Sequence, residues 1–144
     1  MSGIRQVTPG FSVAGQLSRE DIARAAAAGF RTLVNNRPDR EARDQLSDAE
    51  ARAAASKAGL AYHFFPFAGP PPPGVVAETA DLLEQAQAPV LAYCRTGTRS
   101  ITAWAMAQAL TGAQRPEAII DLANGAGYDL SGAREALDRL APKA

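Results

Sequence analysis

The sequence is short of the residues that hold metals and form disulfides. It has 144 residues, with one cysteine, Cys94, and one histidine, His63. A lone cysteine cannot form an internal disulfide, and it leaves no second thiol in the chain to resolve a mixed disulfide. Because zinc sites draw their ligands mainly from Cys and His, neither a metal nor another cofactor is expected. Any sulfur chemistry must therefore pass to an external thiol.

The sequence also has neither an excess of charge of one sign nor a long apolar run. Fifteen basic and fifteen acidic residues cancel to a formal net charge of 0, so no electrostatic case exists for nucleic acid or a membrane surface as partner. No apolar stretch approaches the roughly 20 residues that cross a bilayer. The opening residues, Met1 to Gln6, lack the apolar core of a secretory signal. We therefore expect a cytoplasmic location.

Short apolar strands alternate with helices along the chain. Strands are expected over 11–14, 31–35, 60–67 and 90–93, and helices over 18–29, 47–59, 75–87, 100–112, 115–124 and 131–140. Two helix starts are typical of capping boxes, Ser18 with Asp21 and Ser47 with Glu50. The alternation predicts an α/β fold, a three-layer sandwich with a small, mostly parallel sheet, in a single domain over 1–144.

The segment Cys94-Arg95-Thr96-Gly97-Thr98-Arg99-Ser100 carries the strongest chemical signal. It connects an apolar strand to a helix, so the amides of the loop point inward as an anion-binding nest and the helix N-terminus adds partial positive charge. Arg95 and Arg99 supply two permanent charges. These features favour thiolate over thiol and would hold an oxyanion beside the sulfur. We interpret this loop as an active site.

A second loop is expected to reach the same place. Ligands of open parallel sheets bind at the C-terminal ends of the strands, where the loops after Tyr93 and Asn35 both lie. Arg37 and Asp39 are therefore candidates for a second contribution to the site. An aspartate that follows a proline is more often a turn residue or a helix cap, and that alternative stays open for Asp39.

A nucleophilic cysteine on a strand-loop-helix, closed by an arginine and a hydroxyl residue, resembles the active loops of protein tyrosine phosphatases and rhodanese-type sulfurtransferases. Together with the segments 34–39 (VNNRPD) and 126–130 (AGYDL), it resembles the bacterial phosphatase-like domain of β-lactamase-hydrolase-like proteins (DUF442). The resemblance runs from Gln16 to about Leu140. It implies a protein-tyrosine-phosphatase-like α/β fold, with Cys94 as nucleophile.

Descriptions of this family name both phosphatases and sulfur transferases, and the resemblance does not choose between them. It does imply that Arg99 is the closing arginine. Such domains also occur fused to metallo-β-lactamase-fold hydrolases that act on persulfides, which suggests a hydrolase of that kind as a partner.

Two features of the residues favour sulfur transfer. Four residues separate Cys94 from Arg99, one fewer than in tyrosine phosphatases, and a narrower nest suits a sulfane sulfur or a small sulfur oxyanion. A phosphatase also needs a general acid, and the proline-rich loop 68–75 contains no carboxylate. Asp39 is the one substitute by position. Persulfide transfer needs an acid less, because a thiolate or sulfite leaves unprotonated.

We therefore expect a sulfurtransferase in which Cys94 takes sulfane sulfur from thiosulfate or a small persulfide and passes it to an external thiol. In this mechanism Ser100 hydrogen-bonds the resting thiolate, and Arg95, with Arg37 as a second candidate, orients an anionic donor. The expected site comprises the catalytic residues Cys94, Arg99, Ser100 and Asp39, and the anion-binding residues Arg95, Thr96, Gly97, Thr98 and Arg37.

Three alternatives remain open from the sequence. In a phosphatase of the tyrosine or dual-specificity kind, Cys94 attacks phosphorus, Arg99 clamps the equatorial oxygens of a phosphorylated substrate, and Asp39 is a weak acid. In an inactive anion-binding or interaction module, the loop is kept for stability alone. Ser100 is also a candidate N-cap of its helix, a role compatible with its contact to the thiolate.

Overall fold

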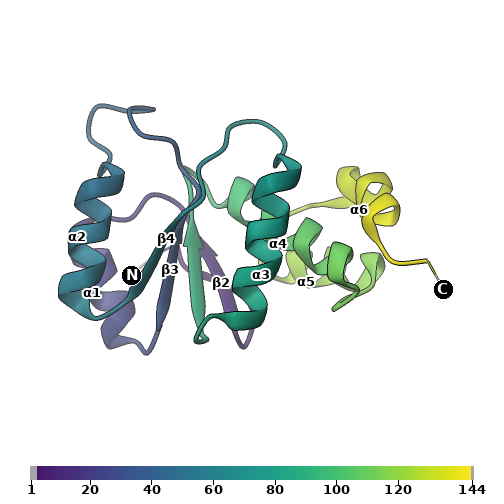
Figure 1. The fold of residues 1–144 in the computed structure, drawn as a ribbon, viewed down its shortest axis with the longest axis horizontal. Coiled ribbons are helices and arrows are strands. Elements are labelled where there is room, and N and C mark those ends of the chain that lie inside the picture. Colours follow the sequence, from purple (N-terminus) through teal and green to yellow (C-terminus); the bar gives the residue numbers. More distant parts are fainter. Residues whose placement is uncertain (1–2, 144) are drawn as a thin grey trace.

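A five-stranded sheet forms the middle layer of the computed structural model, which describes residues 3–143 (Figure 1). In the order β1-β2-β5-β3-β4, its strands are β1 (Arg5–Thr8), β2 (Phe11–Ala14), β5 (Val90–Tyr93), β3 (Thr32–Asn35) and β4 (Ala61–Phe64). β1 pairs antiparallel with β2, and every other pair is parallel. The mostly parallel sheet expected from the sequence is confirmed.

Helices cover both faces of the sheet (Figure 1). One outer layer consists of α1 (Arg19–Ala27) and α2 (Asp48–Ala58). The other consists of α3 (Pro73–Gln85), α4 (Thr98–Thr111), α5 (Pro116–Gly125), a 3₁₀ turn (Ser131–Ala133) and α6 (Arg134–Leu140). The three-layer architecture is therefore confirmed.

Neighbouring residues of each central strand bury their side chains in opposite cores. Leu33 and Leu91 pack toward α1 and α2, whereas Val34 and Ala92 pack toward α4 and α5. This two-sided burial is why the central strands are continuous apolar runs and do not alternate with polar residues. On the α4 side, the buried Trp104 packs against a phenylalanine of β2, with the two rings stacked and their centroids 5.6 Å apart.

Local signals set most helix ends. Both expected capping boxes form: the hydroxyl of Ser18 accepts the N–H of Asp21, and that of Ser47 accepts the N–H of Glu50. Gly59 closes α2 in the left-handed conformation, with φ 84°. Helix α3 starts two residues before its expected first residue, 75, because a proline fits the first turn of a helix, where no N–H is needed.

Two strands differ from the sequence expectation. β1 is missing from it: this edge strand folds back on β2 as a hairpin, and its exposed residues give a weak apolar signal. β4 ends at Phe64 and does not continue to residue 67, because Pro66 cannot donate to a strand ladder and Phe67 turns toward Asn36. Over residues 3–143, no helix is both long and apolar enough to span a membrane.

Candidate active site

Cys94 lies at the C-terminal end of β5, on the floor of the loop that leads into α4. The N–H of Cys94 donates to the carbonyl of Ala14 at 3.3 Å and so extends the pairing with β2 by one residue. The cysteine is fully buried. Its Sγ accepts the N–H of Gly97 at 3.1 Å. The loop therefore aims a backbone amide at the sulfur, as expected of an anion-binding nest.

Gly97 is the N-cap of α4, and no other residue fits there. Its φ of 91° lies in the left-handed region that favours glycine. A Cβ at this position would also collide with the hydroxyl of Tyr128. Backbone conformation and close packing thus both require glycine at the point where the loop turns its amide toward Cys94.

Arg99 stands in the first turn of α4 and is held by a carboxylate from a different loop. Its Nη1 and Nη2 donate to the two carboxylate oxygens of Glu41 at 2.9 and 2.7 Å, and Nη1 also donates to the carbonyl of Phe67 at 3.0 Å. The Glu41 carboxylate raises the pKa of Arg99 above its ordinary value, and the neighbouring Cys94 contributes a smaller part. The guanidinium is therefore fixed and charged near the sulfur.

Arg37 joins the same cluster from the end of β3. Its guanidinium is buried, and it donates from Nε to Glu41 at 2.9 Å and from Nη1 to the side-chain oxygen of Gln16 at 3.0 Å. Glu41 thus bridges Arg37 and Arg99, which brings together the two loops expected to converge. The pKa of Glu41 falls from 4.5 to about 2, first because of its hydrogen bonds to Arg99 and then because of those to Arg37.

Asp39 has a structural contact in place of a contact with the loop. Its carboxylate accepts the N–H of Asp48, the first residue of α2, at 2.7 Å. Within the described part of the chain it makes no hydrogen bond to the Cys94 loop. This contact corresponds to the helix-cap alternative that the sequence left open, because the carboxylate satisfies a free N–H in the first turn of α2.

Ser100 lies in the first turn of α4 but does not cap the helix, because Gly97 is the N-cap. The hydrogen bond expected from Ser100 to Cys94 is absent: the Ser100 hydroxyl is buried and finds no partner within residues 3–143. The sulfur accepts the amide of Gly97 in its place. The hydroxyl of Tyr93, just before Cys94, is likewise buried without a partner among the described residues. A buried hydroxyl without a hydrogen bond costs free energy.

The remaining expected anion-binding residues lie on the outer side of the loop. The side chain of Arg95 is exposed and forms no ion pair with any described residue. The hydroxyl of Thr96 donates to that of Thr98 at 3.2 Å, and both residues are exposed. All three side chains can therefore be reached from solvent.

Two residues that touch the site were not assigned a role from the sequence. Glu41 is one of several charged residues in an irregular segment, although its position four residues after Arg37 is a weak signal. Tyr128 follows α5 and donates its hydroxyl to the carbonyl of Thr96 at 2.9 Å. The segment containing Tyr128 supports the family resemblance, but nothing in its pattern indicates a contact with a residue 32 positions earlier.

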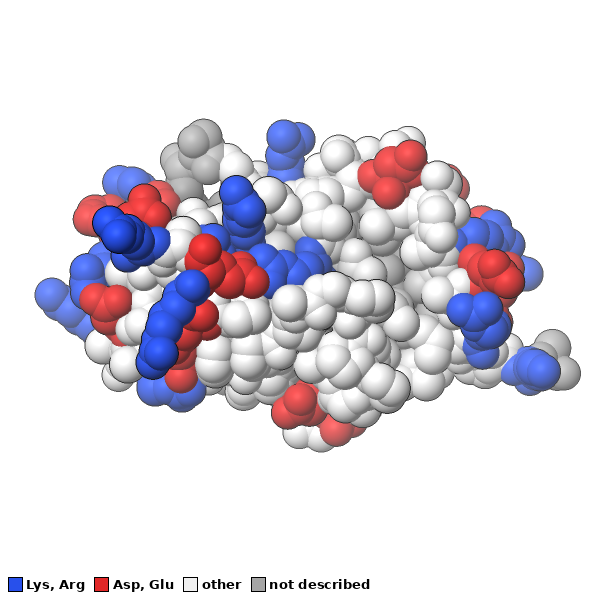
Figure 2. All heavy atoms as spheres, turned by 90° about the horizontal axis from the view of Figure 1, so that it is seen from above, with Lys and Arg blue, Asp and Glu red and all other residues white. Residues whose placement is uncertain are grey.

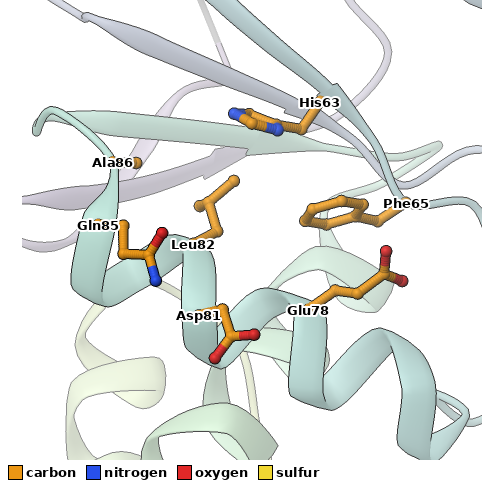
Figure 3. Close-up of a pocket in the computed structure, with 7 residues that line it drawn as sticks. All are labelled: His63, Phe65, Glu78, Asp81, Leu82, Gln85 and Ala86. Carbon is orange, nitrogen blue, oxygen red and sulfur yellow. The ribbon is translucent and has the colours of Figure 1, made fainter.

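The edge of the sheet that carries these loops is shown in Figure 2. Basic and acidic side chains lie next to one another near the middle of this face and toward its α1–α2 side, and a broad uncharged stretch separates them from a second charged group at the opposite end. A separate hollow of about 410 Å³ lies between β4 and α3 and is lined by His63, Phe65 and residues of α3 (Figure 3). It contains no residue of the Cys94 loop.

The site thus combines a buried cysteine at the end of a central parallel strand, an amide on its sulfur and a fixed arginine in the next helix. The fold is that of the protein-tyrosine-phosphatase-like proteins. Tk-PTP in its active form superimposes with a TM-score of 0.72 over 96% of each chain, at 16% sequence identity. At 16% sequence identity, this similarity shows the fold alone.

The chain belongs to the family described as beta-lactamase hydrolase-like protein, phosphatase-like domain, whose model matches residues 3–111. A "putative phosphatase" from Neisseria meningitidis has 34% sequence identity and a TM-score of 0.82, covering 95% of this chain and 97% of its own. The beta-lactamase hydrolase-like protein of Agrobacterium fabrum is 34% identical over 134 residues, or 89% of this chain. The chain spans only 30% of the length of that relative. The family resemblance read from the sequence is confirmed.

Proposed function

We propose that this chain is a cysteine-dependent phosphatase that hydrolyses phosphate monoesters. The observation that carries the proposal is the pairing of a nucleophile with its anion site: the Gly97 N–H meets the Cys94 sulfur at 3.1 Å, and Arg99 is anchored beside it. The same donors that favour a thiolate can hold the oxygens of a phosphoryl group next to it. The phosphatase-like family and fold support this choice over sulfur transfer.

The reaction has two steps. The thiolate of Cys94 attacks phosphorus, an S–P bond forms, and the P–O bond to the leaving group breaks. Water then attacks the phosphorus of the phosphocysteine, which releases inorganic phosphate and restores the thiolate. In both steps the loop amides and Arg99 meet the equatorial oxygens, where negative charge develops.

The anchored arginine keeps donors free for this task. A guanidinium has five N–H groups, and the contacts to Glu41 and Phe67 use three of them on Arg99. Two donors are left, which is what bidentate binding of two phosphoryl oxygens requires. Glu41 therefore orients Arg99 without consuming its capacity to bind substrate.

Proton donation to the leaving group is the weak point of the site. Glu41, with a pKa of about 2, is ionised at neutral pH and has no proton to give. Asp39 is engaged with the start of α2. General acid catalysis contributes roughly 10²–10⁴ in rate. We therefore expect aryl phosphates, whose phenolates leave readily, to react at least about 100-fold faster than alkyl phosphates.

Sulfur transfer is the second candidate, and one observation favours it: only four residues separate Cys94 from Arg99. In that reaction the thiolate attacks the outer sulfur of thiosulfate or a persulfide, an S–S bond forms on Cys94, and sulfite or a thiolate departs unprotonated. An external thiol then collects the sulfur. The absence of a free acid would not hinder this route.

The test is a paired assay on the wild-type protein and Cys94→Ser. One arm supplies p-nitrophenyl phosphate, and the other supplies thiosulfate or glutathione persulfide with cyanide as acceptor. Phosphate release that depends on Cys94 supports the phosphatase. Thiocyanate formation that depends on Cys94, with little phosphate release, would overturn it in favour of sulfur transfer. No turnover in either arm would indicate an anion-binding module.

A further inference from the structure

One peptide group of the active loop is held at both ends. The carbonyl of Thr96 and the N–H of Gly97 belong to the same planar unit and point in opposite directions. The carbonyl accepts the hydroxyl of Tyr128 at 2.9 Å, and the N–H donates to the sulfur of Cys94 at 3.1 Å. The direction of the carbonyl therefore fixes the direction of the amide that meets the nucleophile.

The orientation of this peptide group needs an external hydrogen bond to fix it, because the next residue is glycine. Gly97 lacks the Cβ that restricts other residues, so its backbone has access to conformations with φ of either sign. If the peptide between Thr96 and Gly97 rotated, its carbonyl oxygen would face the sulfur and repel an anion bound there. The hydroxyl of Tyr128 is the side-chain donor that holds the observed orientation.

Tyr128 is itself well anchored. Its N–H donates to the carbonyl of Ala123 at 2.9 Å, which ties the residue to the end of α5. Burial raises the pKa of its phenol, and the nearby Cys94 raises it further, so the hydroxyl keeps its proton at neutral pH. The residue lies beyond 3–111, the part of the chain that the family model matches. The end of α5 thus supplies a fixed hydrogen-bond donor to the active loop.

We propose that Tyr128 is a positioning residue for the Cys94 loop, which keeps the Thr96–Gly97 peptide turned so that its amide faces the sulfur. The inference rests on the proposed function, because it assumes that this loop binds the anionic group of the substrate. Tyr128 acts through the peptide and need not touch substrate. Its loss should weaken the stabilisation of the anionic transition state beside the sulfur more than it weakens the fold.

The experiment compares the wild-type protein with Tyr128→Phe in two measurements. The first is the rate of alkylation of Cys94 by iodoacetate, which is anionic, relative to iodoacetamide, which is neutral. We expect this ratio to fall about tenfold in the variant, the value of one hydrogen bond. The second is turnover of p-nitrophenyl phosphate, where kcat should fall by about the same factor with little change in KM, because the lost amide acts most strongly in the transition state.

The matched control is Tyr62→Phe, which removes a phenolic hydroxyl bonded to Asn35 and Asp48, outside the Cys94 loop. It should lower thermal stability and leave the alkylation ratio within twofold of wild type. Tyr128→Phe that loses stability yet keeps the wild-type ratio would overturn the proposal, and so would a wild-type protein with no preference for iodoacetate. The alkylation ratio needs no turnover, so it tests Tyr128 even if the chain proves not to be a phosphatase.

Discussion

Two loops meet at the same edge of the sheet, and they are built in different ways. The loop after β5 is short, buried at Cys94, and shaped by backbone groups, with the Gly97 amide on the sulfur. The loop after β3, residues 36–47, is mostly exposed or half-buried and is held by side chains, chiefly Glu41 between two arginines. Nucleophile and anion nest are thus local, whereas the fixed charge beside them depends on contacts between distant residues.

This difference predicts how each loop responds to substitution. Replacing the nucleophile of the backbone-built loop should remove the chemistry and leave the fold intact. Changes to the ion pairs of the side-chain-built loop should affect activity and stability together, because those pairs orient Arg99 and neutralise the buried Arg37.

The largest effect is expected at the nucleophile. Cys94→Ser replaces the sulfur with a poorer nucleophile of similar size, so turnover should fall at least about 10³-fold while the fold is kept. Steady-state kinetics and circular dichroism measure the two quantities. Residual activity near the wild-type level would place the chemistry elsewhere and remove the distinction between the loops.

Glu41→Gln should have the next largest effect. The neutral amide orients both arginines less well and leaves Arg37 buried without a counter-charge. We expect kcat/KM to fall roughly 10- to 30-fold, equivalent to about 1.4–2 kcal/mol, with a lower midpoint of thermal unfolding. Glu117→Gln, which removes a carboxylate from exposed ion pairs, is the matched control. It should change neither kcat/KM nor the midpoint of thermal unfolding. Equal effects of the two substitutions would contradict the bridging role of Glu41.

The pH dependence of stability sharpens this prediction. The pKa of Glu41 is lowered from 4.5 to about 2 in the folded protein, so its ion pairs stabilise the fold fully only above pH 4.5. That contribution is lost as the pH falls through this range toward 2. The free energies of unfolding of the wild type and of Glu41→Gln, measured with denaturant, should therefore differ at pH 7 and become equal near pH 2. A constant difference would show that Glu41 stabilises the fold by something other than its charge.

Ser100→Ala tests the unpartnered hydroxyl of the backbone-built loop. Removing a buried hydroxyl that has no hydrogen bond should raise the free energy of unfolding by about 1 kcal/mol. A simultaneous severalfold fall in kcat would show that the hydroxyl is kept for chemistry. Unchanged kinetics would leave packing as its one role.

Asp39→Ala should give the smallest effect on catalysis. The substitution removes the oxygen that accepts the N–H of Asp48, so unfolding should become easier by about 1 kcal/mol, the usual value of a capping contact. Turnover of an aryl phosphate should stay within about threefold of wild type. A loss of a hundredfold or more would make Asp39 the general acid after all.

The alternation of strands and helices could be read from the sequence because burial on both faces leaves the central strands as apolar runs bounded by turn signals. The capping boxes at Ser18 and Ser47 are equally local, and both form. The edge strand β1 was not predicted, because most of its side chains are exposed or half-buried and its apolar pattern is therefore weak. The end of β4 was placed three residues too late, since Phe65 and Phe67 continue the aromatic pattern past Pro66.

The candidate site divides in the same way. Its nucleophile, turning glycine and closing arginine lie within six consecutive residues, so their spacing alone indicates the chemistry. The hydrogen bond expected from Ser100 to the sulfur is not formed among the described residues, because sequence spacing places a side chain on a helix but does not set the direction of its hydroxyl. The catalytic role of Ser100 stays a prediction. Asp39 and Glu41 are two residues apart, and only their contacts separate a helix cap from the carboxylate that holds Arg99.

The sequence by itself therefore determined the layered α/β fold and a loop able to activate Cys94, because the apolar runs, the helix caps and the spacing of the loop residues are all local patterns in the chain. The tertiary structure alone decided that Glu41 anchors Arg99 and that Tyr128 holds the Thr96 carbonyl. Those partners lie 58 and 32 residues away from the groups that they contact. Only folding brings such residues within hydrogen-bonding distance, and no local periodicity records it.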